Sequence, residues 1–219
     1  MIVVYRNFFR NKMVNLSYQS VMNFLPTARV FCFSFYKKNQ QEYETQEPLN
    51  PDIVNFYLQT AFVSGNQITD HIDSTKTSGY QNSDNGKYFV EGYNEIFKVF
   101  KLRTESVLML SEDHFFTNGN TLKELVSNDY DIAYAPWDNE LDANGSILCL
   151  NFYALRHLFP LPVASMPIER LLQDNLITKI DNKRRYKILN RKHTNYFGDG
   201  VYTNSSEEMK VKMSEAKLI

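Results

Sequence analysis

The side chains best suited to chemistry in this sequence are two carboxylates and an imidazole that directly follow an apolar run. Residues 107–110 read VLML, and Ser111, Glu112, Asp113 and His114 come next. Four apolar residues without a gap predict a strand buried on both faces, as in the centre of a parallel sheet. Open α/β sheets bind their ligands at the carboxyl ends of such strands. Because carboxylates suit Mg²⁺ or Mn²⁺, with waters and substrate phosphates as further ligands, the stretch predicts a metal and phosphate site. The plainer interpretation is an acidic strand end at the surface.

Composition and charge limit the classes of protein to consider. The chain has 219 residues, of which 43% are hydrophobic, enough for a substantial core, and we expect a single domain over 1–219. The net charge is −1, with acidic and basic residues mixed along the chain, which argues against a nucleic-acid binder.

Cysteine use and hydropathy indicate the expected compartment. Cys32 and Cys149 both lie inside apolar runs, so we interpret them as buried small residues rather than a disulfide or zinc site. This fits a reducing compartment. No apolar run approaches the roughly 20 residues of a membrane helix, and the first residues become polar too soon for a signal peptide. We expect a soluble, cytoplasmic protein without a membrane span.

The first half of the chain has the order of a parallel α/β unit. Apolar strands are expected at 2–5 and 30–36. Between them a helix is expected, because apolar residues recur at helical spacing, and Pro26 ends it. These residues are Val14, Tyr18, Val21, Met22 and Leu25. Such a β-α-β unit forms a parallel sheet with a right-handed crossover. A second helix is expected after Asn50 and Pro51, on an apparent stripe of Ile53, Val54, Tyr57, Leu58, Ala61 and Phe62.

A polar stretch, 64–87, separates this helix from the next one. It contains Asp70, His71 and Asp73, which are metal-ligand types but are better interpreted as solvated loop residues. The tetrapeptide 91–94 then leads into a helix with Ile96 and Phe97 on one face, and that helix feeds the strand at 107–110.

The second half of the chain is mixed in character. A capping box of Thr121 and Glu124 predicts a short helix, and strands are expected at 131–135, 147–150 and 188–189. Helices are expected at 151–158 and from Pro167. The predicted fold class is an α/β/α sandwich with a mostly parallel central sheet and a mixed C-terminal half that includes an antiparallel element.

The acidic strand end, in this order of elements, resembles that of the GT-A-fold (Rossmann-like) glycosyltransferases. That family ends a buried strand in a short acidic motif, usually Asp-x-Asp, and here the motif aligns with Ser111, Glu112 and Asp113. Ser111 departs from the first acid of the family, which leaves metal dependence open. In size the chain also resembles the compact glycosyltransferases encoded by large algal viruses and phages.

The resemblance implies a reaction and a set of partners. The reaction is sugar transfer from a nucleotide-diphosphate sugar, with a UDP-sugar as the expected donor, to a hydroxyl of a glycan or other acceptor. The implied cofactor is Mn²⁺ or Mg²⁺, which bridges the diphosphate and neutralises the charge that develops on it.

The expected site residues fall into three groups. Asp113 and His193 are the expected metal ligands, His193 by its late position in the chain. Asp138 and Glu169 are the candidate catalytic carboxylates, although Glu169 equally fits the first turn of a helix. The expected nucleotide-sugar-binding residues are Tyr5, Arg6, Asn7, Arg10, Gly92, Asn94, Glu112 and Trp137. Among these, the two arginines suit a diphosphate and Trp137 suits a sugar ring or the core.

Two other functions stay open at this point. A nucleotidyltransferase also uses carboxylates and Mg²⁺ on an α/β sheet, but it normally carries a Gly-rich loop after its first strand, and no glycine follows Tyr5 here before residue 65. A non-catalytic module that binds a nucleotide-sugar would use the same pocket without a metal. The donor sugar, the acceptor and the stereochemistry of transfer are likewise open.

Overall fold

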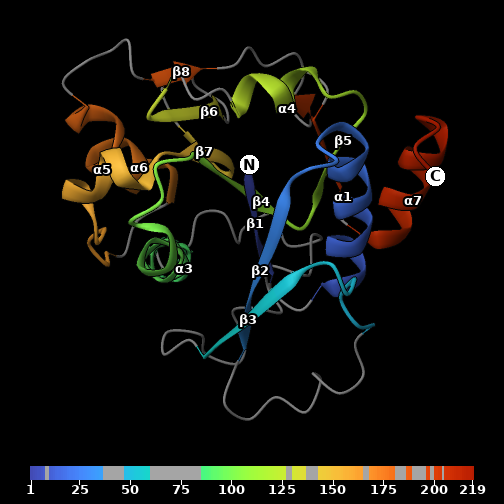
Figure 1. Cartoon of the computed structure of the whole chain (residues 1–219), viewed down its shortest axis with the longest axis horizontal. Helices are drawn as coiled ribbons and strands as arrows, with labels where there is room; N and C mark the ends of the chain where they lie inside the picture. Colours follow the sequence, from blue (N-terminus) through green and yellow to red (C-terminus); the bar gives the residue numbers. More distant parts are fainter. Residues whose placement is uncertain are drawn as a thin grey trace.

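A seven-stranded sheet forms the centre of the computed structural model (Figure 1). The structure describes residues 1–7, 10–36, 47–59, 85–126, 130–136, 143–164, 168–180, 186–188, 196–197, 200–203 and 205–219. In sheet order the strands are β3 (Val54–Gln59), β2 (Arg29–Tyr36), β1 (Ile2–Asn7), β4 (Val107–Ser111), β7 (Ala143–Leu150), β6 (Ile132–Pro136) and β8 (Tyr186–Ile188).

The direction of the strands confirms the predicted fold class. Strands β3, β2, β1 and β4 pair in parallel, and so do β6 and β8. Strand β7 is antiparallel to both of its neighbours, β4 and β6. The sheet is therefore mostly parallel, and its mixed half comes after residue 130 as expected.

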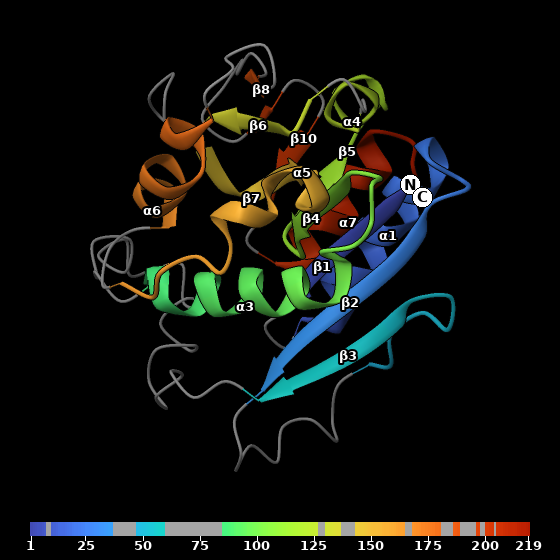
Figure 2. The same cartoon turned by 60° about the vertical axis from the view of Figure 1, so that its left-hand side comes forward.

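Helices cover both faces of the sheet. On one side lie α3 (Asn85–Phe100), α5 (Phe152–Leu155) with the 3₁₀ turn Arg156–Leu158, and α6 (Ile168–Asn175), which is followed by a 3₁₀ turn at Ile177–Lys179. On the other side lie α1 (Asn11–Phe24) and α4 (Asn120–Leu125). Figures 1 and 2 show the sheet between these two groups. This arrangement is an α/β/α sandwich.

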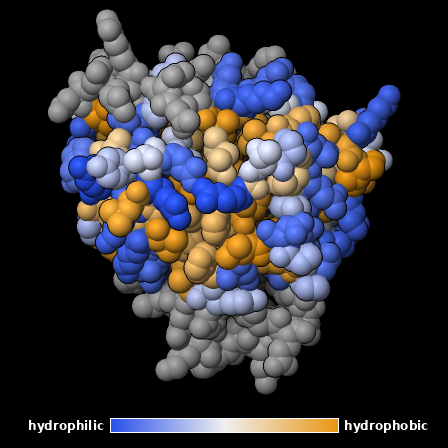
Figure 3. All heavy atoms as spheres, in the orientation of Figure 1, coloured by the Kyte–Doolittle hydropathy of each residue, from blue (hydrophilic) through white to orange (hydrophobic). Residues whose placement is uncertain are grey.

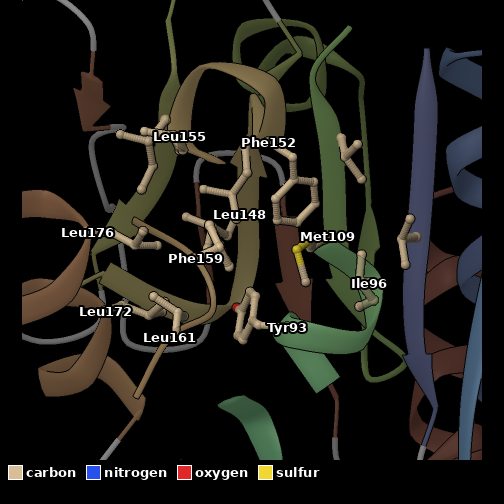
Figure 4. Close-up of a cluster of buried hydrophobic side chains, with 14 of the residues drawn as sticks. Tyr93, Ile96, Met109, Leu148, Phe152, Leu155, Phe159, Leu161, Leu172 and Leu176 are labelled. Atoms are coloured by element: carbon tan, nitrogen blue, oxygen red, sulfur yellow. The ribbon is translucent and has the colours of Figure 1, made fainter. Parts of the chain in front are cut away.

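The central strand β4 shows how the sequence pattern leads to this arrangement. Val107 and Met109 point into the cluster that contains α3, whereas Leu108 and Leu110 point into the cluster that contains α1 and α4. All four side chains are fully buried. The ungapped apolar run is thus explained by burial on both faces, as predicted. Figure 4 shows the first of these clusters, where side chains of α3 and α6 meet those of β4 and β7.

A second, three-stranded sheet joins the acidic strand end to the C-terminal part of the chain. Strand β5 (His114–Phe116) pairs antiparallel with β10 (Gly200–Tyr202), and β10 pairs with β9 (Tyr196–Phe197). The final helix, α7 (Ser206–Glu215), packs on α1 through a separate apolar cluster.

The prediction of a helix after Pro51 is wrong. Residues Val54–Gln59 form the edge strand β3, parallel to β2, and Ala61 and Phe62 lie outside the described residues. The alternation decides the outcome: Phe56 packs on Phe33 at 4.8 Å between ring centroids, whereas Tyr57 is 61% exposed. Aromatic and β-branched residues on a half-buried strand satisfy pairing and packing together, which the helical stripe does not.

Two helix starts also differ from the predictions. Helix α3 begins at Asn85, so the tetrapeptide 91–94 lies inside the helix rather than before it. Helix α4 is capped by Gly119 without a side-chain hydrogen bond, so Thr121 and Glu124 do not form the predicted capping box. Gly119 at this N-cap lies close to Phe24 of α1, where an added Cβ would come 2.8 Å from the Phe24 side chain.

The two cysteines lie where the sequence predicts them. Cys32 and Cys149 are both buried and free, as predicted. Figure 3 shows hydrophobic and hydrophilic residues interspersed on the face viewed in Figure 1. In the part of the chain that the structure describes, no helix has the length and apolarity needed to cross a membrane.

Replacement of Leu110 tests whether β4 is the centre of the fold. Leu110→Ala should lower the free energy of unfolding by about 2–5 kcal/mol, because it leaves a cavity between β4 and the helices above it. Leu102→Ala is the matched control, since Leu102 is 77% exposed, and it should change stability by less than about 0.5 kcal/mol. Urea unfolding measures both values. Equal effects of the two substitutions would contradict a buried central strand.

Candidate functional site

The carboxyl ends of β1 and β4 meet where the chain order of the sheet reverses. From β1 the chain passes through α1 to β2 on one side, whereas β4 on the other side is reached through α3. The two strand ends lie side by side, since Arg6 of β1 is in register with Ser111 of β4. Open α/β sheets bind their ligands at such a switch point. The residues at these ends therefore form the candidate site.

Arg6 is a fully buried cation at this junction. Its Nη2 atom donates a hydrogen bond to Oγ of Ser111 at 3.0 Å, and its guanidinium lies 5.0 Å from the centre of the Tyr93 ring of α3. Ser111 thus serves the arginine as a neutral acceptor. A carboxylate here would have been paired with the buried cation.

Two carboxylates follow Ser111 in the turn between β4 and β5. Oε1 of Glu112 lies 3.9 Å from Nε of Arg10, and Oδ2 of Asp113 lies 4.0 Å from Nη1 of the same arginine. Glu112 is buried, whereas the Asp113 side chain is 18% exposed. The site therefore combines two acids and two arginines, with Asp113 as the acid that solvent reaches.

The two acids differ in pKa. Burial raises the pKa of Glu112 from its usual 4.5 to about 7, and the charge of Asp113 adds to this effect while Arg10 and Arg6 oppose it. Burial also acts to raise the pKa of Asp113, but the charge and hydrogen bond of His114, together with Arg10, hold that pKa below its usual value. Asp113 is therefore the anionic member of the pair, and Glu112 can hold a proton near neutral pH.

Asn7 connects the end of β1 to the first turn of α1. Its Oδ1 accepts the backbone N–H of Arg10 at 2.8 Å, and its Nδ2 donates to Oδ1 of Asn11 at 2.6 Å and to Oγ of Ser34 at 3.1 Å. The Ser34 hydroxyl in turn donates to Oδ1 of Asn55 at 2.9 Å. These bonds fix the backbone from which Arg10 reaches the acids.

Three of the expected nucleotide-sugar-binding residues make other contacts. The hydroxyl of Tyr5 shares a hydrogen bond with that of Ser17 at 2.9 Å, inside the cluster on the α1 side. Gly92 lies within α3, where an added Cβ would come 2.8 Å from the Phe35 ring. The Asn94 side chain exchanges two hydrogen bonds with the backbone of Leu161. The described contacts of these residues are with other parts of the protein and not with Asp113.

Several expected site residues lie outside the described residues. They are Trp137, Asp138 and His193, together with Asp70, His71 and Asp73 of the polar stretch. Glu169 is the second residue of α6, but the description does not extend to its side chain. Among the predicted site residues with described side chains, the structure brings together Arg6, Asn7, Arg10, Glu112 and Asp113.

Sequence reasoning missed the residues that hold the acidic turn in place. The backbone N–H and the hydroxyl of Thr203 both donate to the carbonyl oxygen of Asp113, at 2.8 and 3.1 Å. Nδ1 of His114 lies 2.7 Å from Oδ1 of Asp113. Thr203 is 90 residues further along the chain, and no local pattern marks a contact of this kind.

The turn after β4 provides one or two of the carboxylate ligands that a hard divalent cation needs. Across the described segments, no group of three or more His, Cys, Asp or Glu side chains is gathered to hold a metal ion. Asp113 offers a partly exposed carboxylate beside the buried Glu112. Mg²⁺ and Mn²⁺ are commonly held by one or two carboxylates, with waters and substrate phosphates as the other ligands.

Comparison with known proteins gives only distant likenesses. No protein-family model matches the chain, and no curated protein matches it. The galactosyltransferase LgtC, solved with donor and acceptor sugar analogs, is 10% identical, with a TM-score of 0.46 over 87% of this chain and 73% of that one. The glycosyltransferase GlyE of Streptococcus pneumoniae is 14% identical, with a TM-score of 0.49 over 86% of this chain and 44% of that one. Similarity at this level says nothing about activity, which must be argued from the residues of the site.

The raised pKa of Glu112 predicts a pH-dependent stability. Between about pH 4.5 and 7 the folded protein holds a proton that the unfolded chain has lost, so stability falls as the pH rises, by about 3 kcal/mol in total. Glu112→Gln removes this titration and should gain that much stability relative to wild type across the window. Urea unfolding below, within and above the window measures the difference.

The exposed Glu215 at the end of α7 offers a control for this measurement. Glu215→Gln should leave the pH profile of unfolding close to that of wild type. A profile for Glu112→Gln that runs parallel to that of wild type would contradict the burial argument.

Proposed function

We propose that this protein is a glycosyltransferase that transfers a sugar from a nucleotide-diphosphate sugar, with a UDP-sugar as the expected donor, to a hydroxyl of a glycan or other acceptor. The observation that carries the proposal is the acidic turn of Glu112 and Asp113, flanked by Arg6 and Arg10 at the switch point between β1 and β4. The GT-A-like character of the fold and the resemblance of the acidic motif are consistent with this reaction.

Asp113 is the proposed ligand of Mn²⁺ or Mg²⁺. Its carboxylate is partly exposed, its pKa is held low, and it stands at the edge where ligands of such sheets bind. Glu112 is a second ligand or a contact to the ribose, and His193 is a further proposed ligand. When bound, the metal would neutralise the charge on the diphosphate leaving group.

Arg10 is the proposed contact to the diphosphate. Its guanidinium lies beside both acids and is 16% exposed, so a phosphate oxygen can approach it from the solvent side. A planar guanidinium can donate two parallel hydrogen bonds to a phosphate. Arg6 is fully buried and donates to Ser111, so it contributes its positive charge from beneath the site instead of contacting the ligand.

The acceptor side of the reaction requires a carboxylate that removes a proton from the attacking hydroxyl in an inverting enzyme. We propose Asp138 and Glu169 for this role and Trp137 as an aromatic surface for the sugar ring. Tyr5, Asn7, Gly92 and Asn94 belong to the proposal only as the scaffold beneath the nucleotide, since their described contacts are with the protein itself.

Loss of Asp113 should abolish metal-dependent binding of the donor. In wild type, Mn²⁺ with the correct member of a panel of UDP-, GDP- and TDP-sugars should raise stability by about 3 kcal/mol at about 100 times the Kd, which thermal shift detects. Asp113→Ala should show no such shift with Mn²⁺. Asp174→Ala is the control, because Asp174 is a surface acid of α6 in an ion pair with Arg170, and it should respond as wild type does.

The same panel separates an enzyme from a binding module. A transferase should hydrolyse its donor slowly in the absence of acceptor, and released nucleotide reports this. A shift in melting temperature without any hydrolysis would favour the non-catalytic module. The transferase proposal does not survive if no nucleotide-sugar shifts the melting temperature, with or without metal.

Removal of the Arg10 guanidinium should weaken nucleotide binding. Arg10→Gln should raise the Kd for UDP by about tenfold or more, because a charge-assisted hydrogen bond contributes about 1.5–3 kcal/mol. Arg170→Gln, on the surface of α6, is the matched control and should leave the Kd unchanged. Isothermal titration calorimetry with UDP and Mn²⁺ gives both values, and an unchanged Kd for Arg10→Gln would refute the role of Arg10.

A further inference from the structure

The C-terminal part of the chain holds the backbone of Asp113. Thr203 follows β10 directly, and both its N–H and its hydroxyl donate to the Asp113 carbonyl, at 2.8 and 3.1 Å. Thr203 is fully buried, so water does not compete for these bonds. Two donors from one residue fix the position of the turn at the point where its carboxylate leaves the backbone.

The side chain of Asp113 is held by its neighbour His114. Nδ1 of His114 lies 2.7 Å from Oδ1, which leaves Oδ2 on the side of Arg10. His114 itself is fully buried, is in register with Tyr202 of β10, and lies 5.3 Å from the Tyr202 ring between ring centroids. The orientation of the carboxylate therefore depends on a strand whose partner comes from the C-terminal segment.

Helix α7 anchors this segment to the rest of the protein. Its buried Met209 and Met213 pack with Phe115 of β5 and Val201 of β10. Near the start of α7, Glu207 forms an ion pair with Lys12 of α1 at 2.6 Å. Helix α7 therefore packs on β10, β5 and α1 together.

We propose that His114 and Thr203 are positioning residues that orient Asp113 toward a bound divalent cation, so that β10 and Thr203 support the site from the C-terminal part of the chain. The inference deepens the proposed function and rests on it, since Asp113 is the proposed metal ligand. Hydrogen-bond partners of metal-ligating carboxylates fix ligand geometry, and their loss commonly costs 10–100-fold in metal affinity.

A purely structural role for these residues makes a different prediction. Buried hydrogen bonds of Thr203 and His114 would stabilise the fold whatever Asp113 does. Under that role, substitutions would lower the free energy of unfolding but leave the affinity of the folded protein for a cation unchanged. Affinity and stability must therefore be measured on the same variants.

The test uses Thr203→Val and Thr203→Ser of the full chain, with Thr121→Val, a buried threonine of α4, as control. Thr203→Val keeps the shape and the backbone bond but loses the hydroxyl donor, whereas Thr203→Ser keeps that donor. Binding of Mn²⁺ alone is followed by the electron paramagnetic resonance signal of the free ion, and stability by urea unfolding. We expect Thr203→Val to weaken Mn²⁺ binding by about tenfold, and Thr203→Ser and Thr121→Val to bind as wild type does.

A second pair of variants examines the imidazole. His114→Asn places an amide N–H close to the position of Nδ1 and should retain most of the affinity, whereas His114→Leu should lose about 10–100-fold. Wild-type affinity in both Thr203→Val and His114→Leu, with stability lowered, would overturn the inference and leave the proposed function standing. Thr203→Val alone decides the matter if His114→Leu fails to fold. Absence of Mn²⁺ binding by the wild-type protein would instead overturn the proposed metal site and this inference together.

Discussion

The parallel pairing of β1 with β4 is the contact on which the rest of the structure depends. It places Arg6 opposite Ser111, and Arg10, just before α1, lies beside the acids of the turn after β4. The pairing is stable because β4 is buried on both faces, by α3 on one side and by α1 and α4 on the other. Hydrophobic burial of one strand thus brings the ends of β1 and β4 together, where the candidate site lies.

Balance of charge then determines the character of that site. Ser111 is a neutral partner for the buried Arg6 beneath two acids. Burial raises the pKa of Glu112, whereas His114 and Arg10 hold the pKa of Asp113 low against the effect of burial. Here both signs are within reach of one another, which suits a ligand that consists of a cation and a diphosphate.

Much of the fold follows from local pattern, but the errors have a common physical cause. The ungapped apolar run of β4 predicted a strand buried on both faces, and the spacing of apolar residues predicted the β-α-β order at the start of the chain. The helix expected at Val54–Gln59 is a strand, because β2 offers a free edge and a stacking partner for Phe56, and neither is visible along the chain. Short apolar segments are ambiguous until a neighbour is known.

By itself the sequence determined which residues could bear chemistry: Arg6, Arg10, Glu112 and Asp113 stand at the ends of predictable elements. Only the tertiary structure decided how they act. Glu112 is buried, and Asp113 is held by its neighbour His114 and by Thr203, which is 90 residues further along the chain. A pKa or an orientation depends on such surroundings rather than on residue type. The acidic stretch 111–113 therefore consists of three different parts: a neutral partner for Arg6, a buried acid, and a partly exposed carboxylate.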